Sequence, residues 1–333
     1  MSYTSLDESK FRVKRIYHEK FQRIIILQSY NGPCPLIAIC NILSLSGLVS
    51  LQHCIDSDGY LTRNTLCTVV VDYVMKRLRR SGSTTASCTR NEIAVHDVVE
   101  LVPLLFDGMN INVKFDGVDS FENTREQEVL DACGVRLVHG WLIDPHEEDI
   151  RQEVRGRCFN AMTAQRTEGN AQLFAHWMDE NASQLSFSGL FALTAEVVEG
   201  SLVVFFRNNH FSVLTKHGSI LYTLLTDSEA ANDHQGVTWQ SLEDVDGSAS
   251  RFVNLFPQRS VTPPPPSLLA PITAVPMHNR REQVGLHGQQ PIYQPEHYFP
   301  RPGEMVMTGT VVARPVDEGK KRKMKEDSDC CIM

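Results

Sequence analysis

One cysteine and one histidine in this 333-residue chain stand in the sequence contexts that a thiol hydrolase needs. Cys34 lies in the segment NGPCP, residues 31–35, and His210 lies in RNNHF, residues 207–211. A thiol that gives its proton to a nearby histidine can attack a carbonyl carbon, and the histidine then protonates the leaving amine. The two segments therefore predict cleavage of an amide-type bond, with Cys34 as the nucleophile and His210 as the base.

The segment that follows Cys34 predicts a buried helix over residues 35–46. It is apolar nearly all round at helical spacing, Pro35 suits a first helical position, and Gly47 suits the helix end. Cys34 would then face unpaired backbone N–H groups and the positive end of the helix dipole, which favour the thiolate. We therefore expect a lowered pKa for the Cys34 thiol. The alternative is a buried structural cysteine, a common environment for this residue.

A candidate oxyanion donor lies upstream of the cysteine. Gln28 comes six residues before Cys34, at the end of the apolar run 24–27. Its side-chain amide can turn back beside the sulfur, and with the backbone N–H of Cys34 it would form a two-donor oxyanion hole. This spacing is the one that papain-like hydrolases use, so we predict a catalytic role for Gln28.

Predicted β-strands position the histidine. β-Branched and aromatic residues predict strands over 202–206 and 210–215, with His210 where the two meet. A third, orienting group is expected on the next strand, 219–226, and Asp227 at its end is the candidate. Two alternatives remain at this point: His210 as a hydrogen-bonded core histidine, and Asp227 as an ordinary turn residue.

Hydrophobic periodicity elsewhere predicts helices first and strands later. Further helices are expected at 64–80, 91–101, 125–133, 147–158 and 168–183, and further strands at 111–115 and 137–143. Helices followed by a run of antiparallel strands are typical of the α+β class. The predicted fold is that of papain-like cysteine proteases, in which a helical part with the nucleophile helix packs on an antiparallel sheet that carries the histidine.

Several blocks of the chain resemble the MINDY deubiquitinases, which are cysteine proteases that cleave polyubiquitin. The blocks are QSYNGPCPLIAICNILSL (28–45), LVHGWLIDP (137–145), LSFSGLFALT (185–194), FFRNNHFSVLTKH (205–217) and residues 221–227. They occur in order and cover roughly residues 10–256. The resemblance implies that Cys34 is the nucleophile, that Gln28 forms the oxyanion hole and that His210 is the base.

The same resemblance implies a substrate and a surface that binds it. Members of the family prefer chains linked through ubiquitin's lysine forty-eight and hold the distal ubiquitin with exposed apolar side chains. The matching positions in this chain are Ile111, Trp141, Phe159 and Phe206. Exposed aromatic side chains suit the apolar patch of ubiquitin. The alternative is that these four side chains belong to the core, because Trp141 and Phe206 lie in strand-like apolar runs.

Composition supports one enzyme domain, residues 1–256, without a metal or other cofactor. The chain is 42% hydrophobic and 22% charged, so this part can bury a core of its own. Its nine cysteines show no Cys-x-x-Cys pair or Cys/His cluster, which argues against a zinc site and fits reduced, cytoplasmic thiols. The net charge of −8 argues against a nucleic-acid partner, whereas an acidic face suits the basic surface of ubiquitin. No apolar run reaches the roughly 18 residues of a membrane span, and the N-terminal segment is too charged for a secretory signal.

The C-terminal part predicts a linker and a lipid anchor. Twelve of the 16 prolines fall between Pro257 and Pro315, so residues 257–319 are expected to be a disordered, proline-rich linker. Residues 320–333 contain a basic run and end in Cys330-Cys331-Ile332-Met333, which fits the C-a-a-X signal for prenylation of Cys330. A prenyltransferase and an anionic membrane surface are the partners that this tail implies. The basic run has two alternatives, a nuclear-localisation patch and a solvated tail.

The sequence therefore favours a cysteine-type deubiquitinase that acts on polyubiquitin and ubiquitinated proteins at cytoplasmic membrane faces. Two other classes of function stay open. A Cys-His pair determines the chemistry but not the substrate, so a papain-like amidase or transferase is one alternative. A catalytically silent, membrane-anchored ubiquitin-binding protein is the other.

Overall fold

Two β-sheets and the helices around them form the protein in the computed structural model, which describes residues 10–29, 32–81, 95–167, 172–229 and 237–256. The helices are α1 (Cys34–Leu45), η1 (Gln52–Cys54), α2 (Arg63–Ser81), η2 (Val102–Phe106), α4 (Gln127–Cys133), α5 (Glu148–Val154), α6 (Phe159–Thr167), α7 (Gln172–Glu180) and α8 (Phe187–Glu196), and residues 95–101 are also helical. The strands are β1 (Lys10–His18), β2 (Phe21–Ile26), β3 (Tyr60–Thr62), β4 (Leu137–His139), β5 (Leu202–Arg207), β6 (His210–His217), β7 (Ile220–Leu224), β8 (Trp239–Leu242) and β9 (Phe252–Val253).

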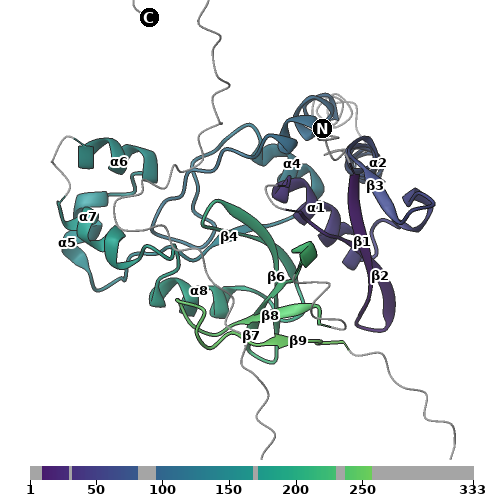
Figure 1. Ribbon diagram of the computed structural model, residues 1–333. Helices are drawn as coiled ribbons and strands as arrows, with labels where there is room; N and C mark the ends of the chain where they lie inside the picture. The colour runs from purple at the N-terminus through teal and green to yellow at the C-terminus, as the bar shows by residue number, and fades with distance from the viewer. Residues whose placement is uncertain (1–9, 30–31, 82–94, 168–171, 230–236, 257–333) are drawn as a thin grey trace, which may run out of the picture.

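The larger sheet has the strand order β4-β5-β6-β7-β8-β9 and is covered on both faces. Side chains of β5 alternate between two cores: Val204 and Phe206 pack into the core that contains α1, and Val203 and Phe205 pack into the core beneath α8. Figure 1 shows this sheet between the two helices. Burial on both faces explains why the run 202–206 is apolar at every position instead of alternating.

The smaller sheet, in the order β2-β1-β3, is joined to the nucleophile helix by buried hydrogen bonds. Asn41 of α1 accepts from the backbone N–H of Ile26 at 2.7 Å and donates to the carbonyl of Ile26 at 3.0 Å. Ser44, one turn further along α1, donates to the carbonyl of Ile24 at 2.6 Å. These bonds satisfy two polar side chains in an otherwise apolar helix, and they hold β2, which leads to Gln28, against α1.

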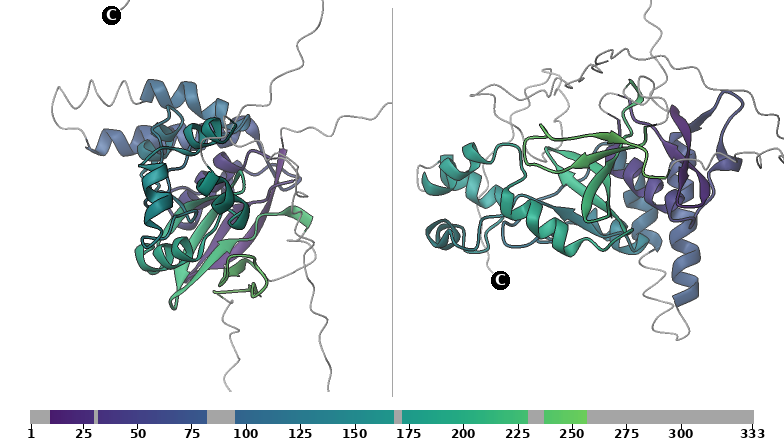
Figure 2. Two further views of the ribbon diagram at one scale, coloured as in Figure 1. Left: turned by 90° about the vertical axis from the view of Figure 1, so that its left-hand side faces the viewer. Right: turned by 90° about the horizontal axis from the view of Figure 1, so that it is seen from below.

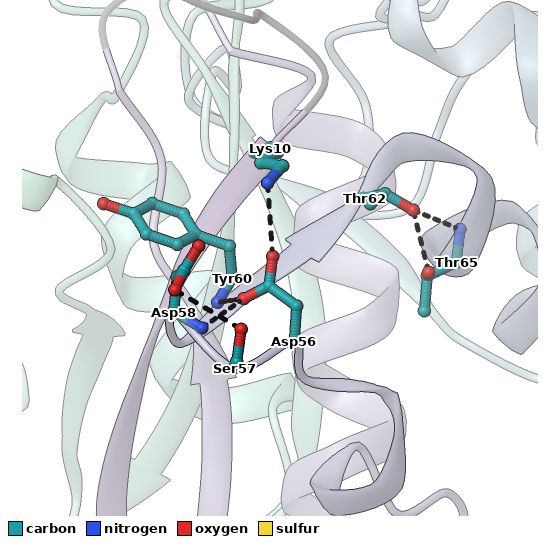
Figure 3. A network of polar contacts seen from close by, with 7 residues as sticks. All are labelled: Lys10, Asp56, Ser57, Asp58, Tyr60, Thr62 and Thr65. Atoms are coloured by element: carbon teal, nitrogen blue, oxygen red, sulfur yellow. Dashed lines mark hydrogen bonds and ion pairs between the residues drawn. The ribbon is translucent and has the colours of Figure 1, made fainter.

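A turn stabilised by Asp56 leads from η1 into β3, and α2 follows β3 directly (Figure 3). One carboxylate oxygen of Asp56 accepts from the backbone N–H groups of Asp58 and Tyr60 at 3.0 and 2.8 Å, and the other lies 3.4 Å from Nζ of Lys10 on β1. The hydroxyl of Thr62 accepts from the N–H of Thr65 at 3.2 Å in the first turn of α2. Such local bonds from Asp and Thr are typical of turns and helix starts.

The short helices α5, α6 and α7 gather at one end of the molecule, while β1–β3 and α2 lie at the other (Figures 1 and 2). Aromatic rings fill the interior of the helical end, with Trp141 in contact with Phe115, Phe159 and Trp177 at centroid distances of 5.5, 5.4 and 5.8 Å. No helix within the described ranges is both long and apolar enough to span a bilayer.

Very close backbone packing attaches α8 to the sheet. A Cβ atom added at Gly189 of α8 would lie 1.7 Å from the carbonyl oxygen of Gly140, so only glycine fits there. Ser186 caps the helix by accepting from the N–H of Gly189 at 3.1 Å, and its own N–H donates to the carbonyl of Gly140 at 3.0 Å. Residues 186–189 contain a capping serine and a glycine, but α8 was not among the predicted helices.

The α+β class is confirmed, with several differences in detail. Residues 111–115 form no strand, because Val113 and Lys114 make only isolated bridges, to Phe121 and Cys158. β4 ends at His139, earlier than predicted, and it runs parallel to β5, so the larger sheet is not purely antiparallel. The elements β1, β2, β3, β8, β9 and α6 also lie outside the predicted helices and strands. The predicted linker and tail, residues 257–333 with Cys330, lie outside the described residues, and the predicted domain boundaries stay predictions.

Candidate active site

Cys34 is the first residue of α1 and is half-buried. Pro33 precedes the helix and Pro35 occupies its first turn, so neither proline interrupts an intrahelical hydrogen bond. α1 packs against β6, the strand that begins with His210. The prediction that Cys34 starts a buried helix next to the histidine strand is confirmed.

A tight hairpin presents His210. Asn208 and Asn209 have φ angles of 50° and 56°, the left-handed conformation that both central residues of a type I′ turn need and that asparagine tolerates. The turn is held from outside the hairpin. The N–H of Asn208 donates to the side-chain oxygen of Gln184 at 3.0 Å, and Nε of Arg207 donates to the carbonyl of Ser183 at 2.8 Å. The RNNH motif is therefore a turn whose first two residues, Arg207 and Asn208, are hydrogen-bonded to the segment before α8.

The thiol lies near the hairpin. The backbone N–H groups of Phe211, next to His210, and of Cys34 itself act on the thiol of Cys34 and favour the thiolate. Burial acts in the opposite direction and is the larger effect, so the pKa of the Cys34 thiol is raised. The expectation of a lowered pKa is wrong for this conformation. A protonated thiol depends on His210 to remove its proton.

His210 has the electrostatic surroundings of a base. Desolvation by its neighbours lowers the pKa of His210, and the charge of Asp227 acts in the opposite direction. His210 is exposed at the start of β6, where a substrate can approach. Asp227 also accepts from the backbone N–H of Glu229 at 3.0 Å, as a turn residue does. Asp227 is thus a turn residue whose charge acts on His210, and its role as the orienting group stays a prediction.

Both predicted oxyanion donors converge on one oxygen atom. The side-chain amide of Gln28 donates to the carbonyl of Gly32 at 3.1 Å, and the backbone N–H of Cys34 donates to the same carbonyl at 2.8 Å. An oxyanion at that position would receive both bonds, which is what an oxyanion hole requires. In this conformation the carbonyl of Gly32 fills the place, so a substrate oxyanion needs the Gly32 peptide to turn away.

The four side chains predicted to hold ubiquitin are buried. Ile111, Trp141, Phe159 and Phe206 are between 4% and 8% exposed, and all of them pack into the larger core. The expectation of exposed anchors is therefore wrong for this structure. The physical reason is that Trp141 and Phe159 fill the aromatic cluster of the helical end, and Phe206 faces α1 from the sheet. Their role in ubiquitin binding stays a prediction.

Metal-ligating residue types come together once within the described part of the chain, at the exposed group His96, Asp97 and Glu100. Arg125 lies 3.5 Å from Asp97 and 2.8 Å from Glu100, so the carboxylates already have a cationic partner. The described cysteines are free thiols: Cys34, Cys40, Cys54, Cys67, Cys133 and Cys158.

Three contributors to the site were missed in the sequence. The N–H of Phe211 is a backbone donor, which no residue type reveals. Gly32 belongs to the NGPCP motif, but only the conformation of the loop shows that its carbonyl accepts from Gln28 and Cys34. Gln184 contacts the hairpin from a segment 24 residues away, and its positive φ of 53° is visible only in the structure.

Comparison with known proteins agrees with the geometry. A family model for MINDY deubiquitinases matches residues 9–255. The chain is 38% identical to Ubiquitin carboxyl-terminal hydrolase MINDY-1 of Homo sapiens over 252 residues, which is 71% of this chain and 52% of that protein. It is 34% identical to Ubiquitin carboxyl-terminal hydrolase MINDY-2 of Bos taurus over 253 residues, which is 73% of this chain and 39% of that protein. The chain thus spans about half the length, or less, of these curated relatives. With Cys34 and His210 brought together in the matched region, the chain belongs to the MINDY deubiquitinase family.

Proposed function

We propose that this protein is a cysteine-type deubiquitinase that hydrolyses isopeptide bonds in polyubiquitin. The observation that carries the proposal is the packing of α1, which begins with Cys34, against β6, which begins with His210. The relatives at 34% to 38% identity are named ubiquitin carboxyl-terminal hydrolases, and this supports ubiquitin as the substrate.

The reaction follows from the positions of these groups. His210 takes the proton of Cys34, and the thiolate attacks the isopeptide carbonyl to form a tetrahedral oxyanion. The amide of Gln28 and the N–H of Cys34 bind the oxyanion once the carbonyl of Gly32 has moved away. His210 then gives its proton to the leaving lysine amine, which leaves a thioester on Cys34. A water molecule, deprotonated by His210, hydrolyses the thioester and regenerates the free thiol.

Asp227 supports the base in this scheme. Its charge raises the pKa of His210 against the effect of burial, so it stabilises the imidazolium that forms when Cys34 loses its proton. Gln28 and Asp227 also pair in a parallel β-bridge. The backbone therefore holds the oxyanion donor and the orienting group next to each other.

Labelling with a ubiquitin that carries an electrophile at its C-terminus tests this function. The purified protein should form a covalent adduct at Cys34, and Cys34→Ala should form none while still binding chains. Cys54→Ala is a matched control, since Cys54 is also a half-buried free thiol. An amidase or transferase with another substrate would ignore the probe, and a silent reader would bind it without a covalent bond. Either outcome would replace the proposal.

The preferred linkage is a finer part of the proposal. The family resemblance favours chains joined through ubiquitin's lysine forty-eight. Cleavage of a panel of diubiquitins, one for each linkage, should show faster turnover of that chain than of the others. Equal rates across the panel would remove the linkage preference and leave the deubiquitinase proposal intact.

Attachment to membranes is the second finer part. Prenylation of Cys330, together with Lys320, Lys321, Arg322, Lys323 and Lys325, would supply the two signals that stable anchoring needs. Cell fractionation should find the wild-type protein with cytoplasmic membranes and Cys330→Ser in the cytosol, with the same activity on free chains. Mass spectrometry that finds an unmodified C-terminus on a fully soluble wild-type protein contradicts the anchor.

A further inference from the structure

The outer side of α8 carries two solvent-exposed phenylalanine rings. Phe187 and Phe191 are 78% and 79% exposed, more than any other large apolar side chain of the described residues. They lie four residues apart and therefore share one face of the helix, here called the phenylalanine pair. The opposite face is buried through Gly189 and Leu193. A helix that is apolar on both sides, with one side open to solvent, indicates a partner on the open side.

The phenylalanine pair is continuous with the candidate active site. Ser183 and Gln184, just before α8, bind Arg207 and Asn208, which form the turn that presents His210. These bonds join the start of α8 to the hairpin of the catalytic base. A molecule that covers the phenylalanine pair would therefore lie next to the hairpin that carries the catalytic base, on the face of the sheet opposite α1.

Acidic side chains flank the pair. Asp144, which is half-buried, accepts from the hydroxyl of Ser188, the residue after Phe187. Arg207, which donates to Ser183 just before α8, also donates to the carbonyl of Val245 at 2.7 Å, and this bond brings the neighbouring Asp244 and Asp246 toward the start of the helix. An apolar centre with acidic flanks complements a partner surface that is apolar at its centre and basic at its rim.

We infer that the phenylalanine pair on α8 binds the apolar patch of one ubiquitin unit of the substrate, with the acidic flanks facing that protein's basic surface. This inference rests on the proposed function. It also provides an exposed apolar surface in place of the four expected anchors, which are buried. A second copy of this chain would bring the same acidic flanks together, and an anionic membrane would be repelled by them, so both fit the surface less well.

The test compares Phe187→Ser and Phe191→Ser with a control, Leu104→Ser. Leu104 is 50% exposed on η2, so the control removes an exposed apolar side chain elsewhere on the surface. Cleavage of lysine-forty-eight-linked diubiquitin gives kcat and KM for each variant. Binding of the same chain to each variant in a Cys34→Ala background, by calorimetry, gives Kd without turnover. Thermal unfolding checks that the variants are folded.

Each phenylalanine variant should raise KM and Kd by roughly tenfold or more, with kcat nearly unchanged, as truncation of an aromatic anchor does. The control should match the wild type. Unchanged KM and Kd in both phenylalanine variants overturn the inference. Loss of self-association in sedimentation, or loss of binding to anionic vesicles, without a change in chain affinity assigns the surface to those partners and overturns it as well. A wild-type protein that binds the chain without cleaving it contradicts the proposed function alone.

Discussion

Gln28 and Asp227 are joined through their backbones. The N–H of Gln28 donates to the carbonyl of Thr226 at 2.8 Å, and the N–H of Ser228 donates to the carbonyl of Gln28 at 3.0 Å, so the two residues face each other across a parallel bridge. The segment after β2 and the segment after β7 are thus held together at the site. One of them carries the amide that can bind an oxyanion, and the other carries the charge that acts on His210.

Removal of the charge of Asp227 should shift the pH profile of the reaction. Asp227→Asn keeps an oxygen that can accept from Glu229 but no longer raises the pKa of His210. The base must be neutral to accept the proton of Cys34, so activity appears as His210 loses its proton with rising pH. With a lower pKa for His210, the acidic limb of kcat/KM should move to lower pH. The apparent pKa of this limb is a property of the coupled Cys34–His210 pair and not of His210 alone.

The same variant series measures how much Asp227 contributes. Asp227→Ala should reduce kcat by less than the roughly 10²–10⁴-fold loss expected for His210→Ala, because packing also holds the histidine. If the acidic limb does not move and both Asp227 variants keep the wild-type kcat, Asp227 stabilises the turn but does not support His210.

Gln28→Ala should reduce kcat by about 10²–10³-fold and leave the affinity for polyubiquitin unchanged, because an oxyanion donor acts mainly in the transition state. Gln28→Glu is the matched variant, since it keeps the shape of the side chain and removes the N–H donor. It should be impaired as well. Single-turnover kinetics and calorimetry in a Cys34→Ala background separate the two effects. A weaker Kd with normal kcat would make Gln28 a binding residue.

Gly189→Ala should destabilise the protein by roughly 2–3 kcal/mol or more, because the new methyl group would overlap the backbone of Gly140. Ala195→Ser, on the exposed side of the same helix, should change the free energy of unfolding by less than about 0.5 kcal/mol. Urea denaturation measures both. A Gly189→Ala protein as stable as the wild type would show that α8 is not packed on the sheet in this way.

Acid should destabilise the protein through His139. Its ring is buried, Nδ1 accepts from the N–H of Trp141 at 3.2 Å, and Nε2 lies 3.3 Å from the carbonyl of Ser120, so the neutral form is held. Burial lowers its pKa from 6.5 to about 4. Because the unfolded chain takes up the proton first, stability is complete above pH 6.5 and is lost as the pH falls toward 4, by on the order of 3 kcal/mol.

The control for this prediction is His139→Gln, which offers an acceptor to Trp141 but does not titrate. Its stability should fall less steeply between pH 6.5 and 4 than that of the wild type. His18, whose pKa is also lowered by burial, contributes to both proteins and cancels in the comparison. Parallel pH profiles for the two proteins would contradict the role of His139.

The sequence by itself predicted the chemistry of the site and determined its local structure. Cys34 at the start of a helix, His210 at the start of a strand and the turn before it depend on short-range preferences of proline, asparagine and β-branched residues, which act over a few positions. The apolar run 202–206 likewise predicted a strand, although not that its two faces enter different cores.

Only the tertiary structure decided how these pieces act on one another. Whether the thiol is buried, which oxygen the Gln28 amide meets and whether Trp141 is exposed all depend on contacts between residues far apart in the chain. Burial raises the pKa of Cys34 against the local effect of the helix, because desolvation by α1 and the sheet outweighs two backbone N–H bonds. For the same reason the predicted anchors are buried and Phe187 and Phe191 are exposed: all are apolar, and only packing selects which of them reach the surface.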